Sequence, residues 1–215
     1  MPSTLVHVAL GGLLAAALLP DRYATRGAIA VVLLTAALPD ADSFVSPFLG
    51  GAHRSLGHNL LLPTLAGLAL AYDLRVRDRS LLRARFGPGS GSVAWTALGA
   101  FVVAGVGLDL VTNGANLLWP VHDQFYTVDG DVLVSSERGV VHTFVDLSPA
   151  EPQPARTTRN LHYSTGVDPS LSPGAESRHV ERVFPVVNGG WQLLLVAAGG
   201  LASALKLRRG PGAIE

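Results

Sequence analysis

Three histidines and three aspartates that border apolar stretches are the side chains best suited to chemistry in this chain. They are His7, Asp40, Asp42, His53, His58 and Asp109, and Arg54 stands beside one of the histidines. Ionisable groups within or beside long apolar segments are costly, so they usually face a polar cavity or take part in function. Asp109 is the clearest case, because a carboxylate at the end of an apolar stretch needs a partner.

Imidazole and carboxylate groups without thiolates are typical of sites for zinc, manganese, iron or magnesium that keep open positions for water. A bound divalent ion lowers the pKa of its water from about 16 toward about 7 and polarises the bond under attack. The six residues therefore predict a divalent-metal site for hydrolysis. Asp42 is expected to serve also as general base, and Arg54 to clamp a phosphate oxygen in bidentate fashion.

Several of these residues also have an ordinary structural interpretation. His7 could be a hydrogen-bonded packing residue, and Pro39-Asp40 could be a helix stop followed by a turn. Arg54 could simply be the ionic partner of a buried carboxylate, or it could contact lipid headgroups. These alternatives stay open at the level of sequence.

The spacing of His53 and His58, five residues apart, does not place both on one face of a regular helix. Both can bind one ion only if the chain bends or a helix starts between them, which Gly57 permits. The remaining histidines are expected to be solvated loop residues: His122, His142, His162 and His179.

Five apolar stretches must position these groups: residues 4–19, 27–39, 57–73, 92–111 and 186–205. A helix that crosses the hydrocarbon core needs about 20 residues, so the last two fit, and the first three imply thin or tilted packing. Buried helices of a soluble protein are the alternative, but no amphipathic partners are present to cover them. No Lys or Arg precedes Arg22, so the first stretch is expected to be retained rather than cleaved as a signal peptide.

The composition excludes several classes of protein. The chain of 215 residues is 48% hydrophobic and 15% charged, which excludes disorder. Sixteen basic residues balance sixteen acidic ones, so no net field gathers a polyanion and nucleic-acid binding is not expected. The absence of Cys excludes disulfides, thiolate zinc sites and iron–sulfur clusters.

The basic residues predict an orientation, because short cytoplasmic loops hold the positive charge of membrane proteins. Ten of the sixteen lie between the first two stretches, between the third and fourth, or after the fifth: Arg22, Arg26, Arg75, Arg77, Arg79, Arg83, Arg85, Lys206, Arg208 and Arg209. These mark the cytoplasmic side. The N-terminus, the linker 40–56 and the polar region 121–185 are then outside, and all the candidate site residues lie at that outer end.

The polar region 121–185 is too long for a simple connection and is expected to form a small extracytoplasmic cap. Residues 125–134 alternate around Asp129-Gly130, which favours a β-hairpin, and 140–147 could add a third strand. Residues 148–177 contain five prolines and are expected to be irregular.

Four segments, taken in order, resemble the YdjM family over about residues 4–125. They are the His7 region, Leu38-Pro39-Asp40-Ala41-Asp42-Ser43, His53-Arg54-Ser55-Leu56-Gly57-His58, and residues 108–120, which read LDLVTNGANLLWP. The resemblance implies an inner-membrane-associated, metal-dependent hydrolase, and the family is also labelled LexA-binding. On matching positions the implied metal site is His7, Asp40, Asp42, His53, His58 and Asp109.

Two positions depart from the family pattern. The family usually has His four residues before the last Asp, where this chain has Gly105, so one ligand or hydrogen-bond donor is missing. His122 or His142 from the cap could replace it. The family has Ser after the second histidine of the HR motif, where this chain has Asn59, a change that could alter hydrogen bonding behind the site.

We therefore expect an all-α multi-pass membrane bundle of about five spans with a small β-containing extracytoplasmic cap. Its parts are residues 1–120 with the metal site, the cap 121–185, and a last span with a cytoplasmic tail at 186–215. The expected function is metal-dependent hydrolysis of an ester or phosphoester, with membrane lipid or a lipid-linked molecule as substrate. The alternatives are a non-catalytic membrane protein with a structural metal site or a partner-binding cap, and a transporter.

Overall fold

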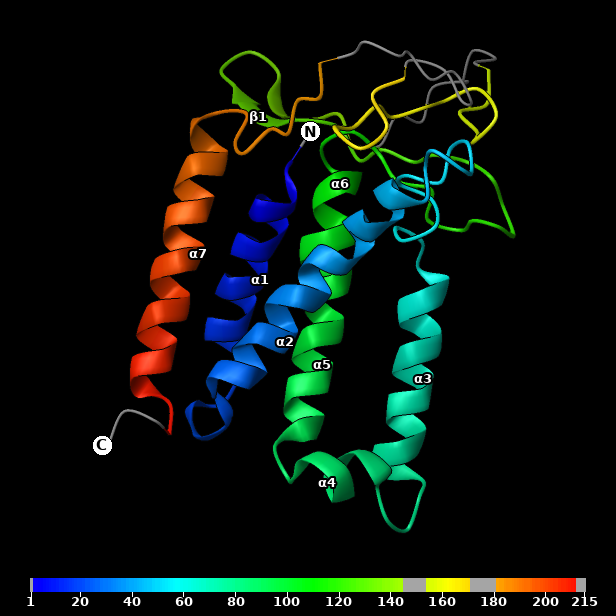
Figure 1. Ribbon diagram of the computed structural model, residues 1–215. Coiled ribbons are helices and arrows are strands. Elements are labelled where there is room, and N and C mark those ends of the chain that lie inside the picture. The colour runs from blue at the N-terminus through cyan, green and yellow to red at the C-terminus, as the bar shows by residue number, and fades with distance from the viewer. Residues whose placement is uncertain (1, 145–153, 171–180, 212–215) are drawn as a thin grey trace.

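The computed structural model describes residues 2–144, 154–170 and 181–211. Its five longer helices are α1 (Thr4–Leu18), α2 (Arg26–Ala37), α3 (Leu61–Arg75), α5 (Ser90–Ala100) and α7 (Gly190–Arg209). These helices run side by side, and the irregular segments gather at the end that holds the N-terminus (Figure 1). The expected mostly helical fold is therefore confirmed.

Short helical segments extend two of these helices toward the irregular end. The 3-10 segment η2 (Leu38–Phe44) continues α2. The π-helical segment η3 (Phe101–Gly107) and the short α6 (Leu108–Leu110) continue α5. At the opposite end, η1 (Asp21–Tyr23) connects α1 to α2, and α4 (Leu81–Phe86) lies between α3 and α5.

Three helical rods in the described part of the chain are long and apolar enough to cross a membrane: Arg26–Phe44, Ser90–Leu110 and Gly190–Arg209. The helices α1 and α3 have 15 residues each, which corresponds to about 22 Å at 1.5 Å per residue and is less than the hydrocarbon core. The expectation of apolar spans is confirmed for three segments, and the count of five stays a prediction.

The core of the bundle consists mainly of small residues where α1, α2 and α5 meet. Ala15, Val32, Ala36 and Ala100 are fully buried there. Helix α7 packs on α1 with little space between the backbones, since a Cβ added at Gly199 would lie 2.2 Å from the Ala9 carbonyl oxygen. Close packing of backbones is the usual way in which membrane helices associate, because lipid supplies no hydrophobic drive between them.

The ten basic residues assigned to the cytoplasmic side lie on η1, the start of α2, the α3–α4 region and the end of α7. All of these elements are at the end of the bundle opposite the irregular segments (Figure 1). Lys206 and Asp21 form an ion pair of 2.7 Å there, which ties the end of α7 to the α1–α2 connection. The charge segregation that the sequence predicts is therefore a property of the folded chain.

The predicted hairpin around Asp129-Gly130 is wrong in position. The two-stranded sheet pairs β1 (Val132–Ser135) with β2 (Gly139–His142), and residues 136–138 make the turn. Residues 125–128 pack on the end of the bundle instead, because Phe125 is buried, Tyr126 pairs with Ala115 through backbone hydrogen bonds, and the Val128 N–H donates to the Leu110 carbonyl oxygen. The candidate third strand at 140–147 overlaps β2, and its residues 145–147 lie outside the described part of the chain.

Candidate metal centre

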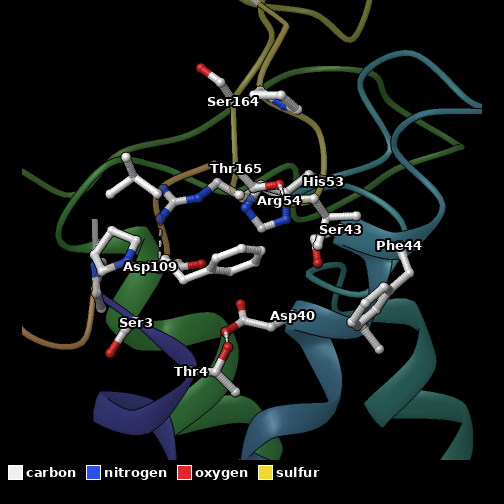
Figure 2. Close-up of a pocket in the computed structure, with 18 of the residues that line it drawn as sticks. Ser3, Thr4, Asp40, Ser43, Phe44, His53, Arg54, Asp109, Ser164 and Thr165 are labelled. Carbon is white, nitrogen blue, oxygen red and sulfur yellow. Dashed lines mark hydrogen bonds and ion pairs between the residues drawn. The ribbon is translucent and has the colours of Figure 1, made fainter. Parts of the chain in front are cut away.

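Four chain segments bring all seven predicted site residues to the end of the bundle where the irregular segments lie. Helix α1 carries His7, and η2 carries Asp40 and Asp42. The linker 45–60 carries the HR motif residues and His58, and α6 carries Asp109. Helix α3 begins only at Leu61, so both linker histidines precede it and the bend that they require is present. Figure 2 shows Asp40, His53, Arg54 and Asp109 directed toward one space.

His7 is buried and has a defined tautomer. Its Nδ1 lies 2.5 Å from the carbonyl oxygen of Ala104 in η3, and a carbonyl can only accept, so Nδ1 carries the hydrogen. In a neutral ring, Nε2 is then a bare lone pair. That atom is 3.7 Å from an Asp40 oxygen and 3.6 Å from an Asp109 oxygen, and it has no hydrogen-bond partner.

His58 presents its Nε2 to the same space. Its Nδ1 is 2.9 Å from Asp42, while Nε2 is 2.9 Å from Asp109 Oδ2 and 3.6 Å from Asp40 Oδ1. His58 Nε2 and Asp109 Oδ2 are both buried and lie at ion-pair distance, but their geometry is not that of a hydrogen bond. Two imidazole nitrogens and two carboxylates thus point at one region.

This donor set fits a divalent cation. Atoms of His7, Asp40 and Asp109 lie within 4.8 Å of one another, as ligands around one ion must. Buried polar atoms are almost always satisfied in proteins, so orphaned nitrogens beside orphaned carboxylate oxygens indicate that a positively charged species belongs between them. The cluster consists of seven residues: His7, Asp40, Asp42, His53, Arg54, His58 and Asp109. With its histidines neutral, three carboxylates and one guanidinium leave two negative charges, which one divalent ion neutralises.

Asp42 contacts the histidines of the cluster rather than the space where His7, Asp40, His58 and Asp109 converge. Its Oδ1 is 2.7 Å from His53 Nδ1, and its Oδ2 accepts from His58 Nδ1 and from the backbone N–H groups of Arg54 and Gly57. With both oxygens engaged, the carboxylate is placed to orient the two rings, an arrangement common behind metal-bound histidines. The assignment of Asp42 and His53 as direct ligands stays a prediction.

Arg54 is fully buried and its guanidinium is held from three sides. One nitrogen donates to Asp109 at 2.7 Å and another to the Gly114 carbonyl at 3.1 Å. The guanidinium also lies over the Tyr163 ring, 4.7 Å from its centroid. Its Nε is buried and has no hydrogen-bond partner. Arg54 is therefore the partner of a buried carboxylate and also a residue that lines the space in front of it.

Gly105 lies against Pro39 in a place with no room for a histidine. A Cβ added at Gly105 would lie 2.5 Å from Pro39 Cγ and 3.2 Å from the Ala36 carbonyl oxygen. The usual family histidine therefore does not fit this arrangement of η2 and η3.

Asn59, the other departure from the family pattern, serves helix α3. Its amide donates to the carbonyl oxygens of Ser55 and Leu56, and its side-chain oxygen accepts from the Leu62 N–H. These contacts hold the turn that precedes α3 and satisfy one of the free N–H groups at its start. The substitution thus bears on how the linker enters the helix.

None of the four other histidines is placed in the cluster by the described part of the chain. His122 is exposed and contacts Tyr126. The side chain of His142 and all of His179 lie outside the described part of the chain. His162 was expected to be solvated, and this is wrong, because its side chain is 4% exposed and lies 3.5 Å from Asp168.

A cavity of about 640 Å³ opens directly above the cluster. Asp40, His53, Arg54 and Asp109 form its floor. Its sides come from the start of α1, from η2, and from the cap segments 164–169 and 181–185. The site therefore has room for a substrate, and two stretches of the cap that the sequence pattern did not connect with the site help to enclose it.

Sequence patterns gave no signal for three further contributors. Thr4 donates to Asp40 at 2.5 Å, and the Ala104 carbonyl fixes His7. Tyr163 packs against Arg54 and His53 and donates to the Asn113 carbonyl. A lone Thr, a backbone oxygen and a Tyr in an irregular loop carry no spacing that could have marked them.

Ionisation in the linker and the cap reflects this burial. Burial alone would lower the pKa of His58, but the carboxylates of Asp109, Asp40 and Asp42 raise that pKa well above its usual value. Burial alone would raise the pKa of Asp168, but hydrogen bonds from Ser170 and Ser46 lower that pKa. The carboxylates around His58 thus favour a positive charge at its Nε2, which a bound divalent ion would supply while the ring stays neutral, and Asp168 favours its carboxylate form.

Comparison with known proteins places the chain. The model of the family described as YdjM inner membrane protein matches residues 1–162, which include all seven residues of the cluster. No curated protein and no solved structure matches the chain significantly. The match covers well over half of the chain and agrees with the resemblance carried by the His and Asp motifs. The chain therefore belongs to the YdjM family of inner membrane proteins.

Proposed function

We propose that this membrane protein is a metal-dependent hydrolase acting on an ester or phosphoester. One observation carries the proposal: His7 Nε2, His58 Nε2 and Asp109 Oδ2 are buried, lack hydrogen-bond partners and converge beside Asp40. An unpaired buried polar atom costs about 1–3 kcal/mol, and three in one place would be a poor way to build a purely structural core.

His7, Asp40, His58 and Asp109 are the proposed ligands, and zinc, manganese, iron and magnesium are the candidate ions. The ion would activate a water and polarise the ester bond under attack. Asp42 acts as the orienting carboxylate that holds His58, and Thr4 holds Asp40. Direct ligation by Asp42 would require its hydrogen bonds to His53 and His58 to give way, whereas His53 could bind an ion through its free Nε2 with its own hydrogen bond to Asp42 intact.

The remaining polar residues of the floor have roles that follow from their contacts. His53 donates Nδ1–H to Asp42, so its other nitrogen is the free one, and the residue lines the cavity. It is therefore suited to accept the proton of the attacking water and to deliver a proton to the leaving group. Arg54 can direct its free Nε–H to an anionic oxygen of the substrate.

A non-catalytic structural metal site is the second candidate, because two histidines and two aspartates are enough to fill a tetrahedral site. The cavity supports the catalytic proposal over this one, since it reaches Asp40 and Asp109 from the open side. Structural metal sites are normally closed by protein. No contact among the described residues favours the alternative of a partner-binding cap. None favours a role in binding a regulator such as LexA either.

The proposed membrane arrangement has five passes, with the N-terminus, the cluster and the cap outside and the C-terminus in the cytoplasm. The basic residues at the far end of the bundle support this orientation. The short helices α1 and α3 would cross in a locally thin or deformed bilayer. A cytoplasmic protein could not then reach the cap.

Hydrolysis can be tested with chromogenic phosphomonoesters, phosphodiesters and carboxylic esters on detergent-purified protein. We expect cleavage of at least one class, inhibition by a chelator and recovery on adding back a divalent ion. Asp109→Asn should abolish this activity, whereas Asp129→Asn on the exposed cap should not change it. Activity that is indifferent to chelator, or equal in both variants, would contradict the proposal.

A further inference from the structure

The cavity above the cluster has a polar floor and a largely apolar side wall. The floor presents Asp40, Asp109 and Arg54. The wall includes Phe44 from η2 together with Val183 and Phe184 from the segment that leads into α7. A ligand that fills this space must therefore combine a charged end with an apolar end.

The apolar wall belongs largely to a part of the chain that the family model does not cover, since the match ends at residue 162. Arg182 joins the two cap stretches by donating to the carbonyl oxygens of Gly166 and Val167 at 3.1 and 2.6 Å. Phe184 lies directly on the backbone of Gly166, where an added Cβ would be 2.6 Å from its ring. The wall is thus held in place by specific hydrogen bonds and side-chain packing between the two cap stretches.

The floor offers a specific contact for an anion. Among the described residues that line the cavity, Arg54 is the one permanent cation, and its side chain is fully buried. Its Nε–H is buried without a partner, so an anionic oxygen that reaches the floor of the cavity would give this donor a charge-assisted hydrogen bond. A phosphoryl group would satisfy this donor, as the geometry of guanidinium groups favours.

The wall continues onto surface that would face the bilayer boundary. Phe44 is 67% exposed and Phe184 is 64% exposed, although both are large and apolar. Phe44 ends the rod Arg26–Phe44 and Phe184 shortly precedes the rod Gly190–Arg209, both of which are long enough to cross a membrane. Exposed apolar side chains at the ends of spanning helices are in place to contact acyl chains rather than water.

We propose that the cavity binds an amphiphile with a phosphoryl headgroup, which enters sideways from the bilayer. The phosphoryl group contacts Arg54, and the hydrocarbon chain lies along Phe44, Val183 and Phe184 and leaves the cavity between the two phenylalanines. This inference names the substrate class of the hydrolase proposed above and therefore rests on that function. It makes the segment 181–185 a determinant of specificity.

Photo-crosslinking in phosphatidylcholine nanodiscs tests the inference without requiring turnover. The probe is dodecylphosphonate with a diazirine near the end of its chain, whose P–C bond a phosphoesterase does not cleave. On the wild-type full chain we expect saturable labelling at residues 41–44 and 183–185. Labelling confined to the outer faces of α3 and α7, where lipid would contact any membrane helix, would overturn the inference.

Competitors separate the possible sources of the ligand chemistry. Unlabelled dodecylphosphonate should compete at least about tenfold better than dodecanol, as expected for one charge-assisted hydrogen bond. It should also compete better than butylphosphonate or inorganic phosphate. Equal competition by dodecanol would exclude the phosphoryl contact, and equal competition by inorganic phosphate would reduce the site to one for free phosphate.

Variants of exposed residues avoid the misfolding that substitution of the buried floor residues could cause. Phe184→Ser should abolish the saturable labelling at residues 183 and 185. Phe48→Ser should leave it intact, because Phe48 is 89% exposed and does not line the cavity. An equal loss in both variants would contradict the inference. Ester hydrolysis without labelling would refute the amphiphile site alone, and labelling without hydrolysis would refute the hydrolase alone.

Discussion

Asp42 accepts hydrogen bonds from both His53 and His58, so its charge acts on the proposed centre through two imidazole rings. Asp42→Asn keeps the size of the side chain but removes that charge, which weakens the orientation and basicity of His58. We expect divalent-metal affinity to fall by about 10–100-fold with the fold retained, the usual effect of losing such a carboxylate. Metal titration calorimetry on purified protein measures this affinity.

The matched control for Asp42 is Asp123, a cap carboxylate that also accepts several hydrogen bonds. Its partners are Asn116 and Thr158, and it lies outside the cluster. Asp123→Asn should leave the metal affinity unchanged. A complete loss of binding in Asp42→Asn would instead indicate that Asp42 is a direct ligand, as the sequence motif alone suggested.

Gly105 provides a second prediction at the level of one residue. Gly105→His restores the usual family residue, but the side chain would collide with Pro39. We expect this variant to lose about 1–3 kcal/mol of stability, as overpacked sites do, without gaining metal affinity. Thermal unfolding in detergent measures the loss. Gly99→His is the control, because an added Cβ there meets nothing within 4 Å. Tighter metal binding by Gly105→His would show that the site can open.

The candidate site could be predicted from residue types, but its inner organisation could not. His7 and Asp109 could be identified from the sequence because ionisable side chains in apolar stretches cost free energy unless they have a partner or a function. Which carboxylate faces the ion depends on the path of the linker 45–60, whose bends carry no periodic pattern. The roles of Asp42 and Tyr163 are therefore features of the folded chain only.

At the scale of elements, a buried carboxylate fastens the cap to the bundle. Asp168 accepts hydrogen bonds from Ser46, which follows η2, and from Ser170, and His162 lies 3.5 Å away. Because the pKa of Asp168 is lowered on folding, this contact stabilises the packing of the cap on the segment after η2 above pH 3.8, and the stabilisation is lost as the pH falls through the lower folded value.

Pepsin cleavage at graded acid pH measures that loss, since the enzyme works in this range. We expect cleavage of wild-type protein within residues 154–170 to rise as the pH drops below 3.8. Asp168→Asn should be cleaved readily at every pH, and the ratio between the two proteins cancels the pH dependence of pepsin itself. A ratio that does not change with pH would contradict the role of Asp168.

The longer helices were predictable as elements, while the cap was not. Apolar stretches of at least 13 residues dictate helices, although α3 begins four residues later than expected because Asn59 organises the preceding turn. The Asp129-Gly130 pair favoured a turn by local preference. Tertiary contacts of Phe125 and Tyr126 overrode that preference and moved the hairpin toward the C-terminus.

At the scale of the whole molecule, the segregation of basic residues predicts which end faces the cytoplasm. The chain has no Cys, so single cysteines can report on topology. In intact cells, Asp129→Cys on the cap should react with an impermeant thiol reagent, and Arg79→Cys between α3 and α4 should react only after permeabilisation. The reverse pattern would place the cluster on the cytoplasmic side and reopen contact with a cytoplasmic regulator.

The metal content of the purified membrane protein tests the central claim most directly. Inductively coupled plasma mass spectrometry should find a stoichiometric divalent metal in wild-type protein and only traces in His58→Ala/Asp109→Asn. The matched variant His162→Ala/Asp168→Asn removes a buried histidine and aspartate that lie outside the cluster, and it should keep the metal. Equal trace metal in all three proteins would contradict the proposed metal centre and, with it, the proposed hydrolase.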